Sequence, residues 1–172
     1  VPALQEFEDG TDPGVFDGPT APVLVSPIDE VEVLTATPDL LVSNAFDPQL
    51  HPLTYEFEVY EDEAMTIPVT AAGGGVPEAD TETSWKVDVL LAENAQYWWR
   101  AAAADPYVQG PWSDLGTFVV NEFNEPPPAP VALFPVLGET VATTDVELSW
   151  VGLDDPDGDE LTFEVVLWDE AM

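Results

Sequence analysis

The sequence contains no cysteine, which excludes disulfide bonds, thiol catalysis and zinc–thiolate sites. Basic side chains are almost absent, because Lys86 and Arg100 face 35 Asp and Glu residues, for a formal net charge of −33 at pH 7. Nucleic acids and anionic membrane surfaces would repel such a chain, so neither is expected as a partner. The carboxylates must be spread over the surface, and divalent cations or saline surroundings are expected to screen them.

Long apolar runs are also missing. No stretch reaches the roughly 18 apolar residues of a membrane span, so direct membrane insertion is not expected. The chain begins at Val1 without the basic, apolar and small-residue order of a signal peptide, which suits a processed or excised segment. Its 45% of hydrophobic residues is nevertheless enough to bury a core, so disorder of the whole chain is excluded.

An internal repeat organises the chain. Residues 22–60 match residues 130–168 without a gap, at an offset of 108. After a one-residue slip, the run 62–65 recurs as 169–172. The second copy is therefore expected to be incomplete. Two explanations stay open: the chain is an excerpt of a longer repeat protein, or the half domain is completed by strands from another molecule.

The repeat predicts four segments. Residues 1–19 form an acidic linker or the tail of an upstream unit, 20–122 a complete domain, 123–129 a proline-rich linker, and 130–172 the first half of a second domain. Three consecutive prolines in the linker favour extended polyproline geometry, which predicts a semi-rigid spacer and a rod of adjacent domains.

Short apolar segments with period-two alternation, separated by turn residues, predict an all-β sandwich. Alternation is clearest at 53–60, where Leu53, Tyr55, Phe57 and Val59 are expected to face the core and Tyr60 to face outward. The counterpart strand at 161–167 keeps an apolar face. Gly73 to Gly75 are expected to form a loop. The strands of the first domain are expected near 23–25, 31–34, 40–44, 53–60, 67–71, 83–87, 96–103 and 116–120.

The run from Leu91 to Ala101, with Leu91 six residues before Tyr97, resembles the penultimate strand of a fibronectin type III domain. The resemblance implies tandem fibronectin type III or Ig-like sandwiches of about seven strands each, the second incomplete, in an extracellular protein. It also implies a corner bond from Tyr97 to nearby backbone. Trp150 takes the place of the family's core tryptophan, and Trp99 is expected to face the core beside Tyr97.

An acidic run at 154–159 is the sharpest chemical signal, because alternate carboxylates around a glycine turn can converge on a hard cation. An EF-hand is rejected, since Val166 replaces the closing glutamate. The sandwich geometry instead predicts a Ca²⁺ site that joins this loop to the linker, as in cadherin-like repeats by analogy. A polar Asp-Gly turn without an ion is the alternative. The predicted ligands are Asp155, Asp157, Asp159, Glu122 and Glu125, and Ca²⁺ is the one cofactor expected.

Aromatic side chains give a second candidate surface. Trp98, Tyr60 and Trp168 are expected to point away from the core, either stacking on sugars or packing against a neighbouring domain. His51, the one histidine, is expected to be an ordinary polar residue in an exposed turn. Carboxylate pairs are too abundant to identify a glycosidase site, and no Ser-His-Asp set or phosphate loop is present, so no enzymatic activity is expected.

These features predict an extracellular or cell-surface structural or adhesive module, in which stacked acidic sandwiches form a rod, fibre or filament. The expected partners are copies of itself or neighbouring repeats, with a polysaccharide or a cell-surface protein as further candidates. The alternative is an accessory carbohydrate- or protein-binding module of a secreted enzyme or receptor. Further copies of the repeat would favour the fibre, whereas an appended catalytic domain would favour the accessory role.

Overall fold

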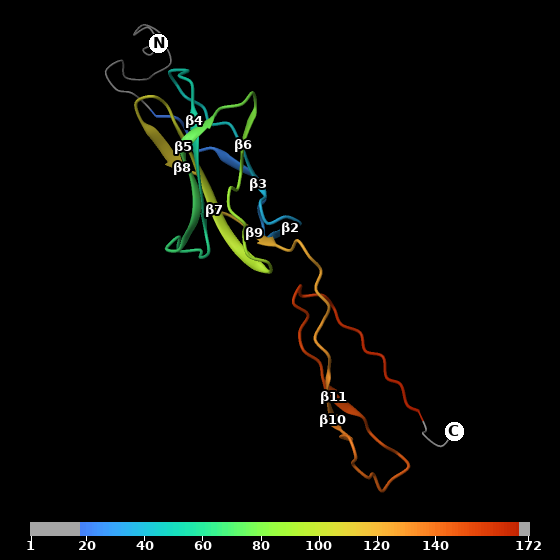
Figure 1. The fold of residues 1–172 in the computed structure, drawn as a ribbon. Helices are drawn as coiled ribbons and strands as arrows, with labels where there is room; N and C mark the ends of the chain where they lie inside the picture. Colours follow the sequence, from blue (N-terminus) through green and yellow to red (C-terminus); the bar gives the residue numbers. More distant parts are fainter. Residues whose placement is uncertain (1–17, 169–172) are drawn as a thin grey trace. The chain divides into compact units, whose positions relative to one another are not determined.

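A computed structural model describes residues 18–168, which divide into a first unit ending at Glu122 and a second unit beginning at Phe123 (Figure 1). All the regular structure in this range is β-strand. Residues 1–17 of the acidic linker expected at 1–19, and the recurring run at 169–172, lie outside the described residues. Across the described range, no helix has the length and apolar character needed to span a membrane.

The first unit is a β-sandwich of two sheets. One sheet has the order β1-β3-β6, and the other has the order β2-β9-β7-β4-β5, with β8 also paired to β7. All the pairs are antiparallel except β2 with β9. The strands are β1 (Val23–Ser26), β2 (Val31–Val33), β3 (Asp39–Ser43), β4 (Thr54–Tyr60), β5 (Pro68–Pro77), β6 (Glu82–Lys86), β7 (Ala95–Ala104), β8 (Gln109–Trp112) and β9 (Gly116–Val120).

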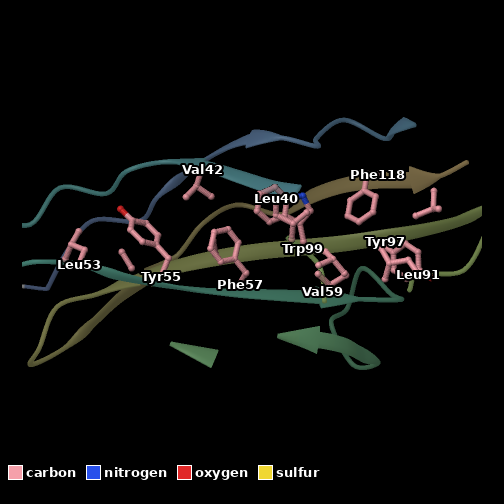
Figure 2. Close-up of a cluster of buried hydrophobic side chains, with 14 residues drawn as sticks. Leu40, Val42, Leu53, Tyr55, Phe57, Val59, Leu91, Tyr97, Trp99 and Phe118 are labelled. Atoms are coloured by element: carbon pink, nitrogen blue, oxygen red, sulfur yellow. The ribbon is translucent and has the colours of Figure 1, made fainter. Parts of the chain in front are cut away.

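Side chains from the facing sides of the two sheets fill the core, as Figure 2 shows. The predicted alternation in β4 is confirmed, since Leu53, Tyr55, Phe57 and Val59 are each at most 4% exposed. Trp99 on β7 is fully buried, and its ring stacks on Phe57 with the centroids 6.2 Å apart. Burial of these large apolar side chains supplies the main stabilisation of the sandwich.

The first and last strands of a seven-strand sandwich are each divided in two in this unit, as β1 and β2 and as β8 and β9. After β1 the chain crosses to the other sheet and continues as β2, where Val31 pairs with Phe118. At the other end, β8 and β9 pair with successive parts of β7. The sequence did not predict β8, because Pro111 lacks the N–H group that a ladder requires and is tolerated only at an edge or irregularity.

The expected loop at Gly73 to Gly75 is wrong, because these residues lie within β5. Tyr55 pairs with Val76 and Phe57 with Ala72, so the glycines lie where the register shifts. Glycine in a strand often marks such a bulge, since it tolerates a local change in backbone direction. The strand therefore continues through a run whose composition is typical of a turn.

Tyr55 predicts a loss of stability at alkaline pH. Its buried hydroxyl accepts a hydrogen bond from Ala45 N at 2.8 Å and donates one to Glu78 Oε1 at 3.2 Å. Desolvation by burial is the main cause that raises the pKa of Tyr55 to about 12. The unfolded chain releases this proton near the ordinary tyrosine pKa of 10.0, so the stabilisation is complete below pH 10 and is lost as the pH rises through 12.

The full loss is about 3 kcal/mol, from two pKa units at about 1.4 kcal/mol each, and about 2 kcal/mol of it is reached by pH 11.5. Denaturant unfolding at pH 9 and at pH 11.5 measures it, with Tyr55→Phe as the control. The phenylalanine variant loses the Ala45 bond, so it starts less stable but should show a smaller alkaline decrease. Equal decreases in both proteins would show that other groups cause the pH effect.

The second unit contains β10 (Val131–Phe134) and β11 (Ser149–Val151), paired antiparallel. Val131 pairs with Val151, Ala132 with Trp150, and Phe134 with Ser149, with one irregularity. In the first unit, β1 and β3 pair through the residues 108 positions earlier, with an irregularity at the same place. Both units thus use the same local arrangement for these two strands.

The third strand expected in the second unit, at 161–167, is not found. In the first unit, the corresponding strand β4 is held between β5 and β7, and neither neighbour has a counterpart among the described residues of the second unit. A segment without a ladder partner cannot satisfy its backbone groups as a strand. Its apolar side chains are exposed, including Phe163 at 47% and Leu167 at 79%.

Candidate functional site

The acidic loop of the second unit forms a tight turn. Asp155 is 8% exposed, and its Oδ1 accepts a hydrogen bond from Asp157 N at 2.9 Å. Gly158, at a φ of 78°, donates its N–H to the Asp155 carbonyl at 3.1 Å. A positive φ favours glycine, so Gly158 lets the chain reverse and keeps Asp157 and Asp159 in one short loop.

Two residues at the start of the second unit contact this loop. Asn124 Nδ2 lies 3.4 Å from Asp157 Oδ2 and 3.2 Å from Asp159 Oδ2, and Glu125 N donates to Asp157 Oδ2 at 2.7 Å. The loop therefore meets the segment that the sequence predicted, through the Asn124 amide and the Glu125 backbone. Glu122 is the last residue of the first unit, so its position relative to this loop is not described.

In this loop, protein N–H groups contact the carboxylates that were expected to bind a cation. Asp157 Oδ1 is buried and has no hydrogen-bond partner among the described residues. Asn124 now presents its NH₂ group to both carboxylates. Half a turn of that amide would present its oxygen instead, which is an oxygen ligand that Ca²⁺ accepts.

The aromatic residues differ in accessibility. Trp168 is 80% exposed and Trp98 is partly buried. The expected exposure of Tyr60 is wrong, since it is only 9% exposed. Tyr60 pairs with Trp98 across β4 and β7 on the outer face of the sheet, but Arg100 covers its ring at 5.8 Å from the centroid.

Arg100 explains this coverage. Its guanidinium donates to Glu58 Oε2 through Nε at 2.8 Å and contacts the same oxygen through Nη2 at 2.7 Å. Its Cζ also lies 4.1 Å from the centroid of the Trp112 ring, a cation–π contact. The aromatic ring nearest to the Arg100 guanidinium is thus that of Trp112.

Of the three residues expected to have structural roles, Tyr97 and Trp99 are buried in the core of the first unit, whereas the expectation that Trp150 is a core residue is wrong. Tyr97 is 3% exposed, and its hydroxyl accepts a hydrogen bond from Ala92 N at 2.8 Å, which is the corner bond that the resemblance implied. Trp99 Nε1 donates to the Pro27 carbonyl at 2.7 Å and so links the two sheets. Trp150 in the second unit is 38% exposed and packs on Phe163, with the centroids 5.7 Å apart.

A further polar cluster, in the first unit, was missed by the sequence analysis. His51 Nδ1 lies 3.3 Å from Asp47 Oδ2 and 3.4 Å from Asp105 Oδ2. The two aspartate side chains are 2% and 0% exposed, and the histidine side chain is 19% exposed. Tyr107 packs edge-on against the imidazole at 5.1 Å. His51 is therefore partly buried, whereas the sequence predicted an exposed turn.

Strand pairing brings this cluster together. Thr54 at the start of β4 pairs with Ala104 at the end of β7, so the loop before β4 and the residue after β7 meet at one end of the sandwich. One sequence signal was available. Asp47 and His51 occupy the repeat positions of Asp155 and Asp159, so the loop that attracted attention in the second copy has a counterpart in the first.

Comparisons with known proteins give a limited result. No protein-family model matches the chain. No curated protein matches it either. Among solved structures, a myokine structure aligns with 17% sequence identity and a TM-score of 0.42, covering 60% of this chain and 98% of that one. An Fn3-like protein from Clostridium thermocellum aligns with 14% identity and a TM-score of 0.37, covering 63% of this chain and 97% of that one.

Proposed function

We propose that this chain is part of a tandem fibronectin type III-like protein whose acidic β-sandwiches serve as structural or adhesive modules outside the cytoplasm. One observation carries the proposal. The pairing of β1 with β3 recurs in β10 and β11 at an offset of 108 residues, with the irregularity at the same place. Repetition of one fold along a chain is the usual construction of rods and fibres, because each copy adds length without new chemistry.

The acidic surface supports the part of this proposal that places the protein outside the cytoplasm. With a formal net charge of −33, neighbouring sandwiches repel one another unless cations or salt screen them. Copies of the chain or neighbouring repeats are the proposed partners. No catalytic activity is part of the proposal, since the one histidine has its Nδ1 beside two aspartates rather than a nucleophile.

Calcium is proposed to order the acidic loop of the second unit. The unpaired Oδ1 of Asp157 supports this, together with the contacts of Asn124. Titration calorimetry of the chain should detect Ca²⁺ binding between micromolar and millimolar concentrations, and Asp157→Asn should weaken it at least about tenfold by removing a charged ligand. The neighbouring Asp154→Asn variant is the charge-matched control. Absence of binding, or equal weakening in both variants, would leave the loop as a polar turn.

The accessory binding role is tested through the aromatic side chains. NMR titration with soluble oligosaccharides should leave the indole N–H signals of Trp98 and Trp168 unchanged if the module is structural. Saturable shifts that disappear in Trp98→Ala or Trp168→Ala would instead identify a carbohydrate surface, because stacked sugars contact the ring faces directly. That outcome would replace the structural proposal with the accessory one.

A further inference from the structure

Asp47 and Asp105 are buried carboxylates that no Lys or Arg neutralises. Asp47 Oδ1 and Asp105 Oδ2 have no hydrogen-bond partner among the described residues, although each carboxylate's other oxygen accepts backbone N–H bonds. The whole sequence has only two Lys and Arg residues, of which Arg100 binds Glu58 and Lys86 is an exposed residue of β6. A buried carboxylate without a compensating partner is strongly unfavourable, because the charge loses its hydration and gains no opposite charge in return.

A hydrogen bond from the His51 imidazole does not account for the positions of the two carboxylates. A hydrogen bond from an imidazole N–H is about 2.7–3.2 Å long and close to linear. The two candidate oxygens lie at 3.3 and 3.4 Å, and Nδ1 forms no hydrogen bond to either within the described structure. One proton would also leave the second carboxylate unpaired.

A metal ion fits the same distances. Zinc bonds to imidazole nitrogen and carboxylate oxygen are about 2.0–2.2 Å long, and at tetrahedral angles two such ligand atoms are about 3.3–3.6 Å apart. The observed separations from Nδ1 are 3.3 and 3.4 Å, and the three ligand atoms all lie within 4.8 Å of one another. The two separations from the imidazole therefore match those of ligands around one tetrahedral ion, and the third ligand atom is close enough to join them.

We propose that Asp47 Oδ2, His51 Nδ1 and Asp105 Oδ2 bind one divalent first-row transition-metal ion such as Zn²⁺. The imidazole decides the class of metal, because Ca²⁺ takes six to eight oxygen ligands, whereas zinc and its neighbours accept nitrogen. In the second unit, Asp159 occupies the repeat position of His51, so that loop presents oxygen ligands alone. The two loops would thus select different ions.

The site would join separate parts of the first unit. Asp47 and His51 belong to the loop between β3 and β4, and Asp105 directly follows β7. The same loop is tied to the start of the described chain, where Thr20 N donates to the Phe46 carbonyl at 2.9 Å. A bound ion would therefore stabilise the end of the sandwich at which residue 18 enters.

His51 is the only histidine in the sequence, so its imidazole signals report on this site alone. The test is a long-range ¹H–¹⁵N NMR titration of the chelator-treated full chain with Zn²⁺, and separately with Ca²⁺. We expect the Nδ1 signal to shift with Zn²⁺ and to saturate at one equivalent, while Ca²⁺ leaves it unchanged. Zn²⁺ bound only to surface carboxylates would not move this signal.

Three variants sharpen the test. Asp105→Asn removes one charged ligand but keeps an oxygen for the Tyr107 and Val108 N–H groups, and should weaken Zn²⁺ binding at least about tenfold. His51→Gln should abolish the one-equivalent site in calorimetry. Asp80→Asn, an exposed charge-matched control, should have no effect.

An imidazole signal that Zn²⁺ leaves in place would overturn the proposal, as would equal weakening in Asp105→Asn and Asp80→Asn. A shift produced by Ca²⁺ at similar concentrations would overturn the assignment to a transition metal. If a variant fails to fold, the NMR titrations of the wild-type chain with Zn²⁺ and with Ca²⁺ still test the proposal.

Discussion

Replacing Trp99 by alanine should lower the free energy of unfolding of the first unit by about 3–5 kcal/mol, the usual cost of truncating a buried aromatic side chain. Trp99 is 0% exposed, stacks on Phe57 and donates its indole N–H to the Pro27 carbonyl on the opposite side of the core. The alanine variant would leave a cavity and an unpaired carbonyl together. Denaturant unfolding followed by far-ultraviolet circular dichroism measures the change.

Trp98→Ala is the matched control, because it removes the same side chain from the adjacent position of β7, on the partly exposed outer face. Its expected cost is about 1 kcal/mol, as for most changes outside a packed core. Trp99→Phe should fall between the two, since it keeps much of the ring but loses the bond to Pro27. Equal costs for the two alanine variants would contradict the assignment of the core face.

Amide hydrogen exchange should differ by orders of magnitude between the two units. The central amides of β4 and β7 are bonded in a five-strand ladder over a buried core, so exchange requires global opening. A stability of about 5 kcal/mol slows their exchange roughly 10³- to 10⁴-fold. Within residues 18–168, the strands β10 and β11 pair only with each other. An isolated two-strand pair is marginal in water, so we expect protection below about tenfold.

Mass spectrometry of peptides from the exchanged chain measures this difference, with the edge strand β8 as an internal reference of intermediate protection. Comparable protection in β10 and β4 would contradict the account. It would mean that the second unit obtains ladder partners or a covered core in solution.

The fold was largely predictable because its signal is local. Alternation at Leu53, Tyr55, Phe57 and Val59 determines which face of β4 is buried, and each of these residues is buried as expected. The spacing of Leu91 and Tyr97 likewise led to a corner bond that depends on only a few neighbouring residues. Local patterns of this kind need no knowledge of distant contacts.

The errors arose where a distant strand or side chain decides the outcome. Gly73 to Gly75 continue as a strand because the residues on either side of them, Ala72 and Val76, pair with β4. Tyr60 lies on the outer face as predicted, but Arg100 covers it from the next strand. The segment 161–167 has the alternation of a strand, but the described part of the chain offers it no neighbouring strand to pair with.

The cluster around His51 could not be found from one loop. Asp47 and His51 are four residues apart, but Asp105 joins them only through the pairing of Thr54 with Ala104. Burial of the two carboxylates is also a property of the assembled sandwich. Comparison of the two repeat copies indicates that the loop with Asp47 and His51 carries polar side chains. The contribution of Asp105 follows only from the three-dimensional fold.

Electron microscopy of the native protein, purified with and without chelator, tests the proposed structural role most directly. We predict ordered filaments or rods that disperse or soften when divalent cations are removed, because cations screen and order the acidic surface. Isolated flexible particles under both conditions would contradict the structural proposal and favour the accessory binding module.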